Sequence, residues 1–231
     1  RLMTMVSLSR RLALMALPVL ALVACGAATG DSSKTPKPGA GAPAAAVSGE
    51  LGHVKGDPNA PITLIEYASP TCPACKFFHD EVFPALEEKY VSTGKVKFVF
   101  REFPIHGQAD VAAYVVALCA GEDRYFDVLD DLFENQDGIV QAANVGALGG
   151  MLKTVAKRHG IETDEAFDAC LENRAYRDQL AAVYQSGEQF GVKGTPTFIL
   201  DGKVRNFEGD FRTAEGFSKQ IDALLAEKGV P

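Results

Sequence analysis

Apolar and polar positions follow one another in a pattern that predicts strands and helices from about Leu51 onward. Residues 62–68 (ITLIEYA) form a short run that is almost entirely apolar, which is typical of a central strand covered on both faces. Residues 96–103 (VKFVFREF) predict a second strand. Between them the pattern predicts a helix over about 73–90, kinked at Pro84 because proline cannot continue the helical hydrogen-bond pattern.

The second half of the chain predicts a long helical block, then a hairpin and a final helix. Over 108–190, apolar residues recur at spacings of three and four, as expected for amphipathic helices. Asp201-Gly202 is a strong hairpin signal between two short strands, 197–200 and 203–206. Residues 212–228 then predict an amphipathic helix. The alternation of strands and helices indicates an α/β protein.

The start of the chain carries targeting signals instead of a core pattern. Arg1, Arg10 and Arg11 precede an apolar, uncharged run of 13 residues, which is too short for a membrane span but typical of a signal peptide. The run ends in Leu-Val-Ala-Cys, which resembles the bacterial lipobox. We therefore expect a lipoprotein signal peptide over 1–25 with a lipidated Cys25. The alternative is a plain signal peptide that is cleaved nearby.

Residues 26–50 consist mostly of Gly, Ala, Ser, Thr and Pro and have no apolar period. Such a composition predicts a flexible tether. A coil of this length spans roughly 25–30 Å, which would hold a folded domain close to a membrane. Together with lipidation, it predicts a lipid-anchored protein on the periplasmic side of a bacterial cell envelope. The alternative is a ragged terminus without such a role.

Composition narrows the possible functions. Hydrophobic residues make up 47% and charged residues 23% of the 231 positions, which excludes a wholly disordered chain and a multi-span membrane protein. The formal charge is −7, and loss of the leader, with three arginines and no acid, makes it −10. An acidic chain argues against nucleic acid as a partner. Five cysteines are too few for a disulfide-dense scaffold, and their odd number needs an explanation.

The motif Cys72-Pro73-Ala74-Cys75 carries the candidate chemistry. It lies where a predicted strand ends and a helix begins, and Pro73 suits the first helical turn. Cys72 would therefore lie at a helix N-terminus, where the dipole and free N–H groups stabilise a thiolate. Cys75, one turn later, is placed to close the disulfide or to resolve a mixed one. We expect Cys72 to be the nucleophile and Cys75 the more buried resolving cysteine.

Half of a zinc site and a structural disulfide are two alternative interpretations of the motif. Structural zinc usually requires four Cys or His ligands, often with a second close pair. Cys119 and Cys170 are isolated, and His79 lies along the same predicted helix. A disulfide that closes a four-residue loop would restrain the unfolded chain little. We expect no metal, and no cofactor beyond a redox-active Cys72–Cys75 disulfide.

The segment EYASPTCPACKFF, the helical block and the later GTPTF together resemble the DsbA-like branch of the thioredoxin superfamily. The resemblance covers residues 51–231. It implies a thioredoxin fold made of 51–107 and 191–231, with a helical domain inserted at 108–190. It also implies thiol–disulfide oxidoreductase activity, with Cys72 as the attacking cysteine.

The resemblance further implies a substrate-binding role for Thr195 and Pro196. The bond between them would be cis and would pack beside the dithiol, exposing neighbouring backbone to an extended peptide. The alternative is a proline at the start of a strand. Two residues differ from the well-known oxidases of the family and bear on whether the protein oxidises or reduces its substrates. Ala74 stands where those oxidases have histidine, and Thr195 stands where they have a bulkier aliphatic residue. Oxidase and reductase or isomerase therefore remain alternatives.

Glu66 is the third candidate catalytic residue. On the predicted strand it shares a face with Ile62 and Leu64, so its carboxylate should be desolvated. It precedes Cys72 by six residues, and the DsbA-like family carries an acid at the matching place. We expect Glu66 to relay protons for Cys75 as bonds form and break. The alternative is a glutamate at a strand edge that reaches solvent.

Two cysteines remain in the helical block, Cys119 and Cys170. In an oxidising compartment they can pair as a structural disulfide. A closed loop of about 50 residues would then contribute roughly 4 kcal/mol in the chain-entropy model. Two separate buried thiols are the alternative. His53, His106 and His159 show no partner pattern.

Three classes of function fit these observations. The first is a thiol–disulfide oxidoreductase that acts on exported cysteine-containing proteins, with oxidase preferred to reductase or isomerase. A membrane or soluble redox partner would then recycle its dithiol. The others are a non-catalytic peptide-binding or chaperone-like module and a metal-binding protein. We expect a monomer, because no dimerisation segment stands out.

Overall fold

The computed structural model describes residues 51–231. The predicted signal peptide with its lipidated Cys25, and the predicted tether over 26–50, lie outside the described residues. No helix in the described part is both long enough and apolar enough to cross a membrane.

A five-stranded mixed sheet lies at the centre of the described chain, in the order β1-β3-β2-β4-β5. β2 and β3 are parallel, so a crossover must connect them, and the helical segment between them supplies it. The other neighbouring strands are antiparallel. The strands are β1 (His53–Lys55), β2 (Ile62–Ala68), β3 (Val96–Glu102), β4 (Thr197–Leu200) and β5 (Lys203–Asn206).

The two central strands coincide with the predicted apolar runs and are buried along nearly their whole length. Successive side chains of a strand point to opposite faces. Leu64 of β2 therefore belongs to the large core on one face, whereas Ile65 and Tyr67 belong to a smaller cluster on the other. Both faces are covered, which explains why the strands lack a polar side.

The predicted helix over 73–90 is present but is not a single α-helix. It consists of α1 (Pro73–Phe77), η1 (Phe78–Val82), α2 (Phe83–Leu86) and η2 (Glu87–Val91), where η1 and η2 have π-helical hydrogen bonds. Pro84 lies in the first turn of α2, where its missing N–H costs least. The apolar positions on this segment could predict its buried side but not the change in hydrogen-bond pattern.

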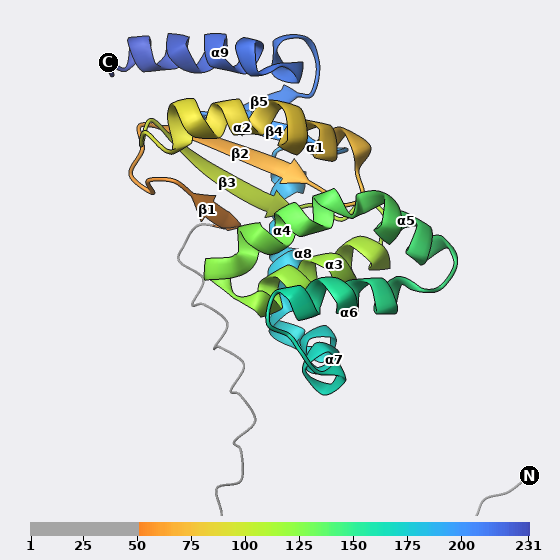
Figure 1. Ribbon diagram of the computed structural model, residues 1–231. Helices are drawn as coiled ribbons and strands as arrows, with labels where there is room; N and C mark the ends of the chain where they lie inside the picture. Colours follow the sequence, from red (N-terminus) through yellow and green to blue (C-terminus); the bar gives the residue numbers. More distant parts are fainter. Residues whose placement is uncertain (1–50) are drawn as a thin grey trace, which may run out of the picture. The chain divides into compact units, whose positions relative to one another are not determined.

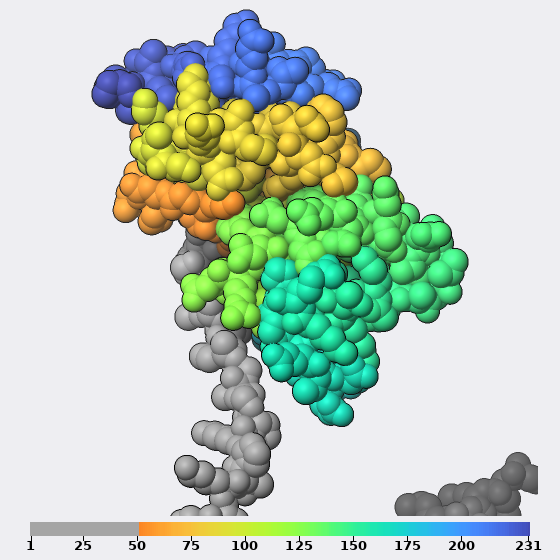
Figure 2. All heavy atoms as spheres, in the orientation of Figure 1, coloured from red at the N-terminus to blue at the C-terminus, as the bar shows by residue number. Residues whose placement is uncertain are grey.

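The predicted helical block is an insertion between β3 and β4. Figure 1 shows it beyond the carboxyl ends of β2 and β3, whereas α9 lies at the opposite end of the view, next to α2 and β5. In Figure 2 the green atoms of α4 and α5 meet the gold atoms of the segment that follows β2. The insertion contains α3 (Gln108–Ala120), η3 (Glu122–Arg124), α4 (Tyr125–Glu134), α5 (Gln136–Asn144), α6 (Leu148–Arg158), α7 (Asp164–Glu172) and α8 (Arg174–Gln189). After β5 come η4 (Gly209–Arg212) and α9 (Ala214–Glu227), and both η3 and η4 are short 3₁₀ helices.

Side chains of the insertion and of the sheet contribute to one continuous hydrophobic core. Within the insertion, a disulfide joins Cys119 at the end of α3 to Cys170 in α7, with 5.8 Å between their Cα atoms. The chain between these cysteines spans a sequence separation of 51, and it includes α4, α5 and α6.

The short strand β1 was not predicted, and it carries a buried histidine. His53 pairs in register with Phe100 of β3. Its Nε2 lies 2.7 Å from Glu102 Oε1, and its Nδ1 lies 3.0 Å from Glu122 Oε2. Burial lowers the pKa of His53, but Glu102 and Glu122 outweigh it and raise that pKa to about 9. His53 therefore ties the sheet to the insertion, because Glu122 belongs to η3 and the ring stacks on Tyr125 of α4.

Candidate active site

The turn between β2 and α1 places Cys72 at the start of a helix. Cys72 is the N-cap of α1 in an extended conformation, and Pro73 occupies the first helical turn. The Cys72 thiol lies 3.3 Å from the carbonyl oxygen of Thr195. Cys75 is fully buried, and its sulfur accepts a hydrogen bond from the backbone N–H of Ser69 at 3.5 Å. Neither cysteine of the motif is in a disulfide in this structure.

The surroundings of the two thiols shift their acidities in opposite directions. A hydrogen bond with the Cys75 thiol lowers the pKa of Cys72 from 9.0 to about 6, against the opposing effect of burial; Thr195 and backbone N–H groups at the helix start add to this lowering. Burial raises the pKa of Cys75 well above 9.0, and Cys72 and Glu66 add to that rise. The reduced motif therefore holds a thiolate on Cys72 and the proton on Cys75.

The insertion anchors the turn that carries Cys72. The Gln136 side-chain N–H group at the start of α5 donates to two carbonyl oxygens, that of Pro70 at 2.8 Å and that of Cys72 at 3.0 Å. The Tyr114 hydroxyl of α3 donates to the carbonyl oxygen of Ala68 at the end of β2. The carbonyl groups of Ala68 and Cys72 also accept backbone N–H groups, from Phe103 at 2.8 Å and from Lys76 at 3.1 Å, so the side chains of the insertion add to a turn that the backbone already holds.

A second anchor lies just before Cys72. The Thr71 hydroxyl donates to Oδ1 of Asp110 at 2.6 Å, and the Thr71 hydroxyl oxygen lies 2.6 Å from Nδ1 of His106. Oδ2 of Asp110 accepts the backbone N–H groups of Ile105 and His106, both at 2.8 Å. Asp110 is fully buried, so these bonds replace its lost hydration. The network joins the turn to the start of the insertion.

Glu66 is fully buried on β2, on the face that the sequence predicts, and not at a solvent-exposed edge. Its Oε2 lies 2.9 Å from Nε2 of His79, while its Oε1 is buried with no hydrogen-bond partner among the described residues. The charge of Glu66 adds to the rise in the pKa of Cys75. His79 stacks on Phe133 of α4, with 4.3 Å between the ring centroids.

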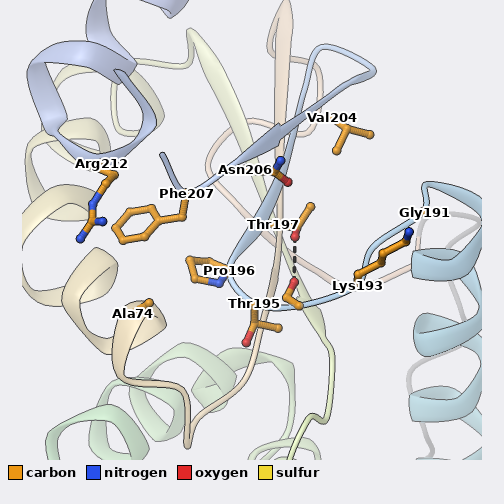
Figure 3. Close-up of a pocket in the computed structure, with 11 residues that line it drawn as sticks. Ala74, Gly191, Lys193, Thr195, Pro196, Thr197, Val204, Asn206, Phe207 and Arg212 are labelled. Carbon is orange, nitrogen blue, oxygen red and sulfur yellow. Dashed lines mark hydrogen bonds between the residues drawn. The ribbon is translucent and has the colours of Figure 1, made fainter. Parts of the chain in front are cut away.

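A cleft lies beside the dithiol, along the loop that leads into β4. The Thr195–Pro196 peptide bond in this loop is cis. Figure 3 shows Pro196 at the centre, with Ala74 of α1 and the Phe207 ring on one side and Lys193 on the other. The cleft has a volume of about 720 Å³. Because the loop also carries the Thr195 carbonyl next to Cys72, a chain lying in the cleft would pass the reactive sulfur.

The structure brings together most of the residues singled out in the sequence. Those gathered around one site are Cys72, Cys75, Glu66, Thr195 and Pro196. Cys119 and Cys170 lie apart from it in the insertion, and Cys25 is outside the described residues.

Sequence reasoning missed three supporting residues, Gln136, Asp110 and His79. Gln136 and Asp110 are 64 and 39 positions from the turn residues that they bind, Cys72 and Thr71, and no local pattern marks such contacts. For His79 a signal did exist, because it lies one helical turn after Cys75 and so on the same side of the segment.

A family model described as thioredoxin matches residues 49–223, which is most of the chain. The chain belongs to this thioredoxin family. Its sheet, its insertion and its relatives place it in the DsbA-like branch.

Two relatives illustrate the similarity of this thioredoxin-family chain. Disulfide bond formation protein D of Bacillus subtilis is 28% identical over 189 residues, covering 76% of this chain and 82% of the relative. A Rickettsia conorii protein, provisionally named a protein-disulfide oxidoreductase, is 31% identical over 181 residues, covering 76% of this chain and 61% of the relative. The chain thus spans about three fifths of the length of the Rickettsia protein.

Solved structures show the same fold. The α-DsbA1 protein of Wolbachia pipientis is 27% identical, with a TM-score of 0.58 over 75% of this chain and 90% of that one. Oxidised BdbD of Bacillus subtilis is 23% identical, with a TM-score of 0.64 over 75% of this chain and 92% of that one. The predicted thioredoxin fold with a helical insertion is therefore confirmed.

Proposed function

We propose that this protein exchanges disulfides with exported proteins, with Cys72 as the nucleophile and Cys75 as the resolving cysteine. The opposed shifts of the two thiol pKa values are the observation that carries the proposal. Only the thiolate attacks a disulfide, and a thiol of low pKa is also the better leaving group. The names of the relatives, which refer to disulfide formation and to disulfide oxidoreduction, support the same chemistry.

In the oxidising direction, a substrate thiolate attacks the Cys72 sulfur of the Cys72–Cys75 disulfide. The Cys72–Cys75 bond breaks, a bond between Cys72 and the substrate forms, and Cys75 leaves and takes up a proton. A second substrate thiolate then attacks the substrate sulfur of this mixed disulfide and expels Cys72 as a thiolate. The substrate loses two electrons, and the protein dithiol gains them. A redox partner in the membrane or in solution must then reoxidise the dithiol.

The lowered pKa of Cys72 favours oxidase over reductase. Stabilising the Cys72 thiolate stabilises the reduced protein, and a more stable reduced form makes the disulfide a stronger oxidant. Ala74 and Thr195 are the residues by which the chain departs from well-known oxidases, so a reductase or isomerase of the same fold is the second candidate.

Glu66 is proposed as the proton relay of Cys75. In the oxidising direction the leaving Cys75 sulfur must take up a proton inside the core, where its side chain is fully buried. The unpartnered Oε1 of Glu66 supports this role, and His79 on Oε2 orients the carboxylate. Thr195 and Pro196 are proposed to bind the substrate backbone, Cys119–Cys170 to act as a structural disulfide, and Cys25 to carry a lipid anchor on the periplasmic side.

The reduction potential of the Cys72–Cys75 couple tests the proposed direction. We expect a value well above the roughly −270 mV of thioredoxin, towards the roughly −120 mV of the strong oxidant DsbA. A value near or below that of thioredoxin, together with rapid reduction of insulin, would establish the reductase instead. If the wild-type protein shows no exchange, and it binds unfolded peptides as well as Cys72→Ser does, the protein is the peptide-binding module instead.

Replacement of Glu66 tests the relay separately. Glu66→Gln keeps the shape of the side chain but can neither deliver a proton to Cys75 nor take one from it. We expect slower reduction of the Cys72–Cys75 disulfide by dithiol peptides and a changed pH profile of that rate. Asp57→Asn, at an exposed acid outside the site, is the matched control. If Glu66→Gln and the control give the same pH profile, Glu66 has no relay role.

A further inference from the structure

The cleft beside Cys72 is basic, although the chain as a whole is acidic. The formal charge of the chain is −7, with 30 acidic and 23 basic side chains. Two cations, Lys193 and Arg212, are among the residues that line the cleft, and no acidic residue is among them. The local charge therefore has the opposite sign to the net charge.

Both cations are exposed and available to a ligand. Neither Lys193 nor Arg212 forms an ion pair with a carboxylate among residues 51–231. Arg212 lies over the Phe207 ring, with 5.3 Å between its guanidinium carbon and the ring centroid, so an aromatic face holds it at the cleft. The nearest acid that precedes Arg212, Asp210, is engaged with Gln220 at 3.0 Å and lies 3.9 Å from Lys219.

The two cations lie on opposite sides of Pro196. Figure 3 shows Arg212 beside Phe207 on one side and Lys193 next to Gly191 on the other. A peptide that extends along this loop, with its cysteine at Cys72, would have one cation near each flank. Charge complementarity across such a surface steers association and sets specificity more than it adds affinity.

Resting on the proposed exchange activity, we propose that this cleft selects substrate segments with acidic residues on either side of the reacting cysteine. The occupant is an extended Asp- or Glu-containing segment of an exported protein. The net charge of the protein would repel such a segment, so any preference for it must come from the local cations.

The test uses three dithiol peptides that differ only in the residues flanking their cysteines: aspartate, serine or lysine. Each peptide reduces the oxidised Cys72–Cys75 disulfide of the full chain, and each rate is divided by the rate of the same peptide with an uncharged disulfide, bis(2-hydroxyethyl) disulfide. The division removes the effect of the flanking charges on the acidity of the peptide thiols. We expect the aspartate peptide to react roughly five- to tenfold faster than the lysine peptide at low salt, with the ratio falling towards one at high salt.

Variants locate the preference. In the double variant Lys193→Gln/Arg212→Gln, the rate of the aspartate peptide divided by the rate of the serine peptide should fall most of the way to one. Lys203→Gln, an exposed cation of β5 that does not line the cleft, should keep the wild-type ratio. A wild-type preference for lysine, or a ratio that the double variant leaves unchanged, would overturn the proposal. Failure of all three peptides to react would instead count against the exchange activity itself.

Discussion

The two cysteine pairs of this chain show how surroundings decide what a disulfide does. Cys72 and Cys75 are three positions apart at a helix start, and their pKa values are shifted in opposite directions. Cys119 and Cys170 are 51 positions apart and join two helices of the insertion. A short loop restrains the unfolded chain little, whereas a long one restrains it strongly. The first pair is therefore suited to exchange and the second to stability.

Loss of Cys72 should have the largest effect. Cys72→Ser removes the thiolate, and we expect exchange with peptide disulfides to fall below detection, at least about 1,000-fold. The other free cysteine of the described residues, Cys75, is fully buried and its pKa is raised well above 9.0, so it does not replace Cys72. Far-UV circular dichroism and thermal unfolding should change little. Substantial remaining exchange would show that Cys72 is not the residue on which exchange depends.

Loss of the other pair should act on stability instead. The double variant Cys119→Ala/Cys170→Ala should lose about 4 kcal/mol of unfolding free energy, the value of the chain-entropy model for a loop of this length. Denaturant unfolding under oxidising conditions measures it, and Cys72→Ala/Cys75→Ala is the matched control. A loss of less than about 1 kcal/mol would show that the Cys119–Cys170 disulfide does not serve stability. Loss of exchange in a double variant that is still folded would show that this disulfide takes part in the chemistry.

Local pattern was enough to predict the parts of this site that neighbouring residues determine. The apolar runs identify β2 and β3, and Pro73 after Cys72 marks the helix start. Pairing across the sheet is what makes β1 a strand, since its three residues have no periodicity of their own.

Contacts between distant positions could not be predicted in this way. His53 showed no partner pattern, yet it lies against Glu102, which is 49 positions away. His106 and His159 likewise have partners that only the fold supplies, Thr71 and Asp131. The sequence could suggest that Glu66 is buried but not that His79 would bind it.

The reactivity of the Cys72–Cys75 pair should depend on pH, because the thiolate of Cys72 is the reactive form. With a Cys72 pKa of about 6, the thiolate fraction rises from about a tenth at pH 5 to about nine tenths at pH 7, so alkylation of the reduced protein should accelerate roughly tenfold. The lowered pKa stabilises the folded reduced protein fully above about pH 9, and that stabilisation is lost as pH falls through 6. Stopped-flow alkylation measures the rate, and a flat profile over this range would contradict it.

The smallest effect concerns the anchor from the insertion. Gln136→Ala leaves the carbonyl group of Pro70 without the Gln136 donor and removes one of two donors to the Cys72 carbonyl, which also accepts the backbone N–H of Lys76 at 3.1 Å. This loss should cost about 1–3 kcal/mol of unfolding free energy. Exchange should slow only severalfold, because the thiol itself is retained. Gln141→Ala, at an exposed position of the same helix, is the control for helix propensity. Equal stability of the two variants would show that the anchor is dispensable.

The most direct test of the proposed chemistry is the titration of Cys72 in the reduced protein, followed by thiolate absorbance with Cys72→Ser as the blank. The predicted result is one thiolate that forms with a pKa of about 6, while Cys75 stays protonated beyond pH 9. A single transition near the roughly 8.5 of an ordinary free cysteine would contradict it.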